Sequence, residues 1–96
     1  MKAYNVVRFK VKPGQETKFV DMHKTFPKIA GMEGGSLIKT GDRTYCFVGK
    51  WKDFDQIVKA RPEMIKVLDG FRGMLEDLGG GLGLTDPVSG SVVAEV

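Results

Sequence analysis

The stretch Arg43–Trp51 constrains this fold more than any other part of the chain, because it is rich in aromatic and β-branched side chains and follows a Gly-Asp pair. Such residues favour a pleated strand, in which successive side chains point to opposite faces. One face then carries aromatic side chains and the other small, apolar and charged ones: Tyr45, Phe47 and Trp51 against Thr44, Cys46, Val48 and Lys50. Neither face is plainly polar, so this pattern predicts a central strand that packs on both sides.

The residues before the central strand predict a strand over Ala3–Lys12, a helix over Gln15–Ile29 and a second strand over Ser36–Thr40. Pro13-Gly14 ends the first strand, because proline cannot donate to the ladder and glycine permits a turn. The helix carries one apolar stripe at helical spacing, formed by Phe19, Met22, Phe26 and Ile29. A tight turn at Gly41-Asp42 then reverses the chain, so the second strand and the central strand form an antiparallel hairpin.

The residues after the central strand predict a short helix capped by Asp53 and broken at Arg61-Pro62, then a further helix that starts at Pro62. The second of these helices carries an apolar stripe formed by Ile65, Leu68, Phe71, Leu75 and Leu78. The remaining segments are a flexible loop at Gly79–Gly83, a turn at Asp86–Gly90 and a last strand at Ser91–Val96. The element order is therefore β-α-β-β-α-β within a single domain, residues 1–96.

Composition excludes several classes of protein. The single cysteine rules out an internal disulfide, and no residue spacing fits a zinc or other metal site. The net charge of +3 permits contact with nucleic acid, but acidic and basic residues are interspersed and no block of like charge argues for it. No apolar run is long enough for a secretory signal or a membrane span, and we expect a cytoplasmic protein without a membrane partner.

A small chain with two partly apolar sheet faces is expected to self-associate. The predicted helices can cover one face, and the other would expose Tyr4, Val6, Cys46 and Val48. Exposed patches of this kind usually mark interaction surfaces, and a two-fold contact between identical chains is the commonest solution. We therefore expect a homodimer.

Three local phrases occur in the order typical of one family: Val11–Glu16, which contains Pro-Gly-Gln-Glu, then Gly31–Leu37 and Phe47–Asp53. In these phrases and in its order of elements, the chain resembles the antibiotic biosynthesis monooxygenase family. The resemblance implies an α+β, ferredoxin-like fold that pairs into a dimeric α+β barrel. It also implies a cofactor-independent monooxygenase acting on a small aromatic molecule such as a phenol, a hydroquinone or a polyketide ring. The tryptophan and histidine that a haem-degrading sister branch carries on the later helices are missing.

Three residues are candidates for catalysis. Asn5 is an amide on an otherwise apolar strand face, so it either holds a substrate anion or bonds a neighbouring loop. It matches an asparagine that several members of the similar family carry on strand one. Trp51 either offers its indole N–H to a ligand or closes the end of the core. His23, the only histidine, either accepts a phenolic proton or packs beside the apolar stripe. The side chains expected to bind substrate are Val7, Phe9, Phe19, Tyr45, Phe47 and Phe71.

Two other functions share these features. A non-catalytic dimer could bind a small hydrophobic molecule in the same fold. An RNA-recognition module has the same element order, and four positions of its strand-three signature agree here: Arg43, Tyr45, Phe47 and Val48. Three informative positions fail, because Thr44, Cys46 and Lys50 replace the expected glycine, small residue and stacking aromatic. Nucleic-acid binding is therefore the less favoured alternative.

Overall fold

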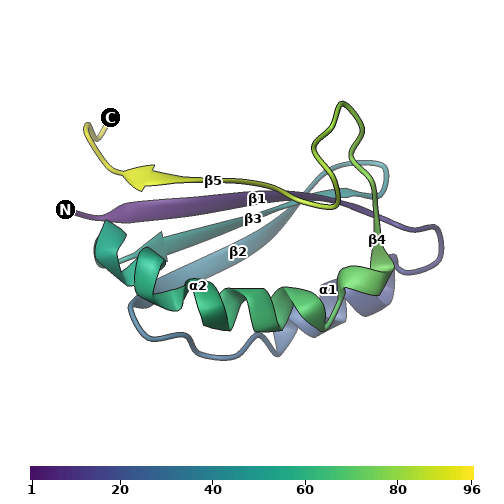
Figure 1. Ribbon diagram of the computed structural model, residues 1–96, viewed down its shortest axis with the longest axis horizontal. Coiled ribbons are helices and arrows are strands. Elements are labelled where there is room, and N and C mark those ends of the chain that lie inside the picture. Colours follow the sequence, from purple (N-terminus) through teal and green to yellow (C-terminus); the bar gives the residue numbers. More distant parts are fainter.

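The computed structural model describes residues 1–96, and it places two helices on one face of an antiparallel sheet (Figure 1). In chain order the elements are β1 (Ala3–Val11), α1 (Glu16–Lys24), β2 (Met32–Gly41), β3 (Thr44–Trp51), α2 (Phe54–Asp69), the 3-10 turn η1 (Arg72–Met74), β4 (Leu75–Glu76) and β5 (Asp86–Ser91). The strand order is β2-β3-β1-β4, and β5 also pairs with β1. This confirms the predicted ferredoxin-like α+β fold. The last strand predicted over Ser91–Val96 was wrong, because only Ser91 of that range belongs to a strand, and the outer edge of β1 pairs instead with β4 and β5.

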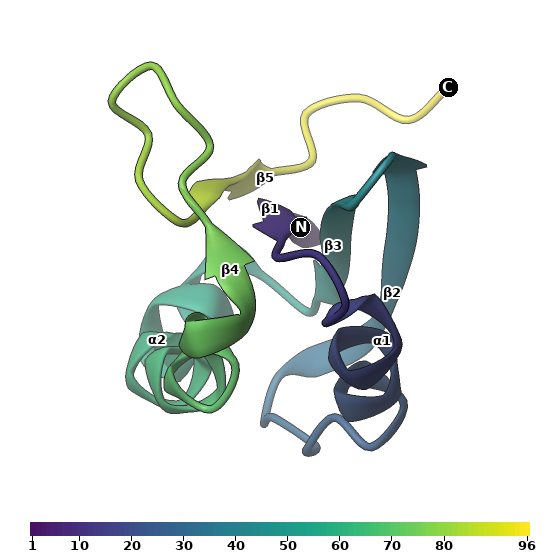
Figure 2. The same ribbon diagram turned by 90° about the vertical axis from the view of Figure 1, so that its right-hand side faces the viewer.

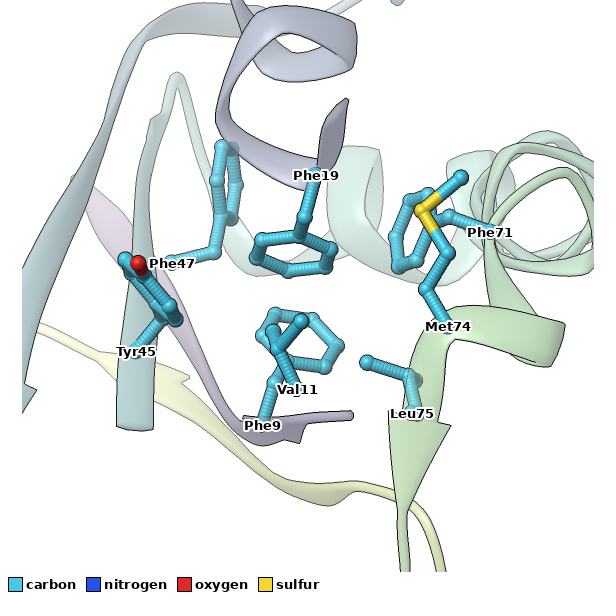
Figure 3. Packing of buried hydrophobic residues seen from close by; sticks show 8 residues of the cluster. All are labelled: Phe9, Val11, Phe19, Tyr45, Phe47, Phe71, Met74 and Leu75. Atoms are coloured by element: carbon cyan, nitrogen blue, oxygen red, sulfur yellow. The ribbon is translucent and has the colours of Figure 1, made fainter. Parts of the chain in front are cut away.

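The helix-facing side of the sheet holds an aromatic core (Figure 3). Phe19 of α1 lies at its centre, with ring centroids 5.5 Å from Phe9, 5.4 Å from Tyr45 and 5.3 Å from Phe71. The contacts with Phe9 and Phe71 are edge-to-face, the geometry that aromatic quadrupoles favour. The alternation predicted for the central strand is therefore correct: its aromatic face is the one beneath the helices.

The first helix is shorter than predicted, and the second strand is longer. α1 ends at Lys24, and Thr25 has left the helical region with φ −109° and ψ 27°. The prediction of a helix to Ile29 was wrong because Pro27 disfavours helical geometry at the residue before it and cannot donate a helical hydrogen bond. Phe26 and Ile29 still pack against the core, but from a loop.

The predicted break at Arg61-Pro62 was also wrong, because α2 continues through Pro62. Asp53 caps this helix as expected, its Oδ1 accepting the Gln56 N–H at 3.0 Å. A proline inside a helix removes one hydrogen bond and crowds the preceding turn, and here burial of Ile57 and Ala60 against the sheet offsets that cost.

The helix predicted to run to Leu78 ends at Asp69 instead, and Gly70 follows it. Leu75 is consequently a strand residue, paired with Val11 of β1. The predicted turn at Asp86–Gly90 is β5, which pairs with β1 from Ala3 to Arg8. The proline and glycine of this segment favoured a turn in the prediction. β5 lies at the sheet edge, where proline is tolerated because one row of N–H groups needs no partner.

The second face of the sheet has no helix over it (Figure 2). Tyr4, Ile38 and Val88 lie on it and are 38%, 47% and 62% exposed. Cys46 is buried on the same face. The partly apolar second face is thus present as predicted; the dimer it suggests remains a prediction. No helix in the structure is both long and apolar enough to cross a bilayer.

Candidate functional site

A cavity of about 510 Å³ lies between α2 and the β1 side of the sheet. Its size is within the range of roughly 300–1,000 Å³ that small-molecule sites occupy. Most of the lining is apolar, with Val7 and Phe9 from the sheet facing Met64 and Leu68 of α2. A few polar groups interrupt this surface: Asn5, His23, Arg61, Thr85 and Ser89. An apolar hollow with a small number of polar groups is the general form of a ligand site.

Asn5 is the one buried polar residue of the chain, at 6% exposure. Its Oδ1 accepts a hydrogen bond from Trp51 Nε1 at 2.6 Å. Because an indole nitrogen can only donate, this bond determines which way the amide lies. The NH₂ group therefore points away from Trp51, and its nitrogen contacts Met64 Sδ at 3.8 Å. Sulfur is a weak acceptor, so the cavity wall presents an N–H donor whose capacity is largely unused.

The Asn5–Trp51 hydrogen bond depends on Gly49, the residue opposite Asn5 in β3. A Cβ atom at Gly49 would overlap Asn5 Oδ1 and come within 3.0 Å of Trp51 Nε1. Glycine at this position leaves the space in which the amide and the indole meet. Glycine is needed at position 49 for space and not for an unusual backbone conformation, since its φ is not in the left-handed region.

His23 lines the cavity from α1 and lies among aromatic rings. Its ring is stacked on Phe26 at a centroid distance of 5.8 Å and lies 5.1 Å from Phe71. Nδ1 is 2.9 Å from the Phe19 carbonyl oxygen, which can only accept, so Nδ1 carries the proton and Nε2 is left with a free lone pair. Burial lowers the pKa of His23 below 6.5, although the bond to Phe19 opposes this effect. The imidazole is therefore neutral near pH 7 and can accept a proton.

Six of the nine residues predicted for the site line this cavity: Asn5, Val7, Phe9, His23, Phe47 and Phe71. Trp51 is fully buried and reaches the cavity only through Asn5. Phe19 is also fully buried, at the centre of the core. Tyr45 lies at a second, more polar hollow of about 640 Å³ between the C-terminal end of α1 and β2. Its hydroxyl donates a hydrogen bond to Glu16 Oε1 at 2.8 Å.

The sequence reasoning missed the residues that α2 and β5 contribute. Arg61 and Met64 line the cavity because α2 is continuous, whereas the expected break at Pro62 separated them. The spacing Ile57, Met64, Leu68 is helical and could have revealed the cavity-facing stripe. Ser89 was placed in a turn, but it lies opposite Asn5 in the β1–β5 ladder, where side chains are close neighbours.

Two further features bear on the alternatives. No group of three or more histidine, cysteine, aspartate or glutamate side chains is placed to hold a metal ion. The rings that an RNA-recognition module would stack on bases, Tyr45 and Phe47, are 5% and 9% exposed and lie beneath the helices. On the open face only Tyr4 could stack on a base.

Comparison with known proteins was informative only at the level of structure. No family model and no curated protein sequence matches the chain. SnoaB, a cofactor-independent oxygenase from Streptomyces nogalater, superposes with a TM-score of 0.70 at 17% identity, covering 99% of this chain and 96% of SnoaB. NE2512 of Nitrosomonas europaea, a protein of unknown function, gives a TM-score of 0.74 at 18% identity, with 99% and 92% coverage.

A Chloroflexus aurantiacus protein, named provisionally as an antibiotic biosynthesis monooxygenase, superposes with a TM-score of 0.71 at 11% identity. The match covers 100% of this chain and 97% of that protein. At such low identity, superposition establishes the fold and not the reaction. This chain has the ferredoxin-like fold of proteins described as antibiotic biosynthesis monooxygenases, as its resemblance to that family predicted.

Proposed function

We propose that this protein is a cofactor-independent oxygenase of a small, electron-rich aromatic molecule. One observation supports this proposal most: the Trp51 indole holds the Asn5 amide so that its N–H groups face an apolar cavity. An N–H donor among apolar walls favours a negatively charged oxygen, because electrostatic interactions are stronger there than in bulk water. Phenols and hydroquinones are the aromatic molecules that produce an anionic oxygen on losing a proton.

The first step is proton removal. His23 is neutral and has a free Nε2 lone pair, so it can accept the phenolic proton near pH 7. Asn5 Nδ2–H then donates to the phenolate oxygen, in the place where it now meets only the Met64 sulfur. These two residues provide a base and an anion-binding donor on the walls of one cavity.

The remaining steps need only the ring and molecular oxygen. The phenolate gives one electron to O₂, and the resulting aryloxyl radical and superoxide combine to form a carbon–oxygen bond. Protonation by the imidazolium of His23 gives a hydroperoxide. Loss of the ring proton at that carbon then breaks the oxygen–oxygen bond and releases water. For 1-naphthol the sum is one O₂ consumed, one naphthoquinone formed and one water released.

We also propose that two copies pair through the open sheet face. Its exposed side chains Tyr4, Ile38 and Val88 surround the half-buried pair Val6 and Val48. Covering these groups would remove apolar area from water in both subunits at once. Most of the cavity lies on the opposite, helix-covered face, and only Val88 of β5 belongs both to the cavity lining and to the open face.

The test is oxygen uptake with 1-naphthol, with naphthoquinone as the product to be identified. Asn5→Asp keeps an oxygen acceptor for Trp51 but removes the N–H donor and adds a negative charge, so we expect turnover to fall by about 100-fold or more. Thr17→Ala, at an exposed position of α1, is the control and should retain full activity. Oxygen uptake that is unchanged in Asn5→Asp would contradict the assignment of this donor. If 1-naphthol raises the melting temperature without any oxygen uptake, the protein is a binder and not an oxygenase.

A further inference from the structure

Arg61 is the one residue of the cavity lining that carries a full charge at neutral pH. The other titratable residue of the lining, His23, is neutral because burial lowers its pKa. No aspartate or glutamate lines the cavity. A positive charge thus lies at the edge of an apolar hollow that contains no group to balance it.

Arg61 also differs from the other arginines of the chain. Arg8 pairs with Asp86, Arg43 with Glu76 and Arg72 with Asp69, whereas Arg61 makes no ion pair and no side-chain hydrogen bond. Its helical neighbours at spacings of three and four are all apolar: Ile57, Val58, Met64 and Ile65. No carboxylate is therefore available on the same face of α2, where surface arginines commonly find one.

We propose that Arg61 binds a carboxylate on the substrate, so that the preferred ligand is an aromatic acid and not a neutral phenol. This inference rests on the proposed function for the aromatic part of the ligand. Val7, Met64 and Leu68 provide the apolar walls that hold the ring. The guanidinium provides the fork of donors that matches a carboxylate with two parallel hydrogen bonds.

Arg61 lies on α2 and Asn5 on β1, so the carboxylate and the phenolic oxygen of a ligand would be recognised at different places in the cavity. Asn5 contacts Met64, which lies about one helical turn beyond Arg61 in α2, and both Met64 and Arg61 line the cavity. A ligand with a hydroxyl and a carboxylate on one fused ring system could reach both Asn5 and Arg61. Because Arg61 is exposed, the carboxylate would lie at the cavity edge while the ring is buried.

The test compares two ligands that differ by one carboxylate, 1-naphthol and 5-hydroxy-1-naphthoic acid, in which the hydroxyl and the carboxylate lie on different rings and do not bond to each other. Dissociation constants are measured by calorimetry for the wild type, Arg61→Gln, Arg61→Lys and the control Arg72→Gln, which breaks a surface pair with Asp69. We expect the acid to bind the wild type about tenfold more tightly than the phenol, an advantage lost in Arg61→Gln and partly kept in Arg61→Lys. Added salt should weaken binding of the acid only.

Each outcome separates this inference from the proposed function. Equal affinity of the wild type for the two ligands, or equal losses of both in Arg61→Gln, would overturn the role of Arg61. Selective binding of the acid without oxygen uptake would retain that role and overturn the oxygenase proposal. If neither ligand binds, the carboxylate inference and the aromatic-substrate proposal are both rejected.

Discussion

Trp51 donates its indole N–H to Asn5 Oδ1 across 2.6 Å, although the two residues are 46 positions apart in the chain. The bond joins the end of β3 to the first part of β1 and leaves no polar side-chain atom of either residue buried without a partner. It also orients the amide: the oxygen is engaged, so the nitrogen faces the cavity. One side chain therefore makes a buried structural hydrogen bond through its oxygen and has its nitrogen at the cavity wall, where the proposed function assigns it to the ligand.

Gly49→Ala should disrupt this pair without changing either partner. The new methyl group would overlap Asn5 Oδ1, so the amide or the indole must shift. We expect a loss of roughly 1–3 kcal/mol in the free energy of unfolding, together with reduced naphthol turnover. Denaturant titration measures the first quantity. Gly34→Ala in β2 is the matched control, because a Cβ there meets nothing within 4 Å. If both variants are equally stable, the steric role of Gly49 is incorrect.

The ring signals of His23 should titrate below pH 6.5, because burial disfavours the charged imidazolium. Proton NMR can follow this directly, since the chain has only one histidine. As the folded-state pKa is lowered, the contribution of His23 to stability is complete above pH 6.5 and declines as the pH falls below that value. The acid limb of the oxygenase rate should follow the same titration, and His23→Gln should remove it. A titration above pH 6.5 would contradict the desolvated environment.

Tyr45 should lose its proton only at about pH 12, since burial and the hydrogen bond to Glu16 both raise the pKa of its phenol from 10.0. The folded protein then holds this proton more tightly than the unfolded chain. Stability from this source is complete below pH 10 and is lost as the pH rises toward 12. Ultraviolet absorbance of Tyr4→Phe isolates the Tyr45 signal. A midpoint near pH 10 in this variant would show that the phenol is not shielded.

Replacing Pro62 by alanine should stabilise the protein. Pro62 lies inside α2, where it removes one helical hydrogen bond, and its side chain is exposed. Alanine would restore the bond, while the greater flexibility of the unfolded chain would offset part of the gain. We expect a net increase of about 1–2 kcal/mol in the free energy of unfolding. Lys59→Ala, exposed on the same helix, should change it by less than about 0.5 kcal/mol. A destabilised Pro62→Ala would mean that α2 needs its proline.

Sedimentation should detect a dimer that Ile38→Lys dissociates. Ile38 is 47% exposed on the open sheet face, so lysine is compatible with the folded monomer but would introduce like charges across a two-fold contact. Thr17→Lys adds the same charge to α1 and should leave the dimer intact. A wild-type protein that sediments as a monomer at micromolar concentration would contradict pairing through this face.

The amino-acid sequence by itself determined the alternation of the strands and the nature of the two sheet faces. Those features depend on residue type and on a period of two, which are local properties. Asn5 could be recognised for the same reason: an amide among Ala3, Val7 and Phe9 is conspicuous on an apolar face. The central strand and its capped neighbour, α2 with Asp53, also follow from local signals.

Tertiary contacts determined the secondary structure of two segments for which the local sequence pattern gave a wrong prediction. Proline and glycine predicted a break at Pro62 and a turn at Asp86–Gly90, but packing against the sheet carries α2 through its proline, and the free edge of β1 holds β5 as a strand. The partner of Trp51 likewise could not be read from the chain, because β-sheet pairing brought Asn5 and Gly49 together from distant positions. Local preferences amount to about 1–3 kcal/mol per residue, and burial summed over a helix or a ladder can exceed them.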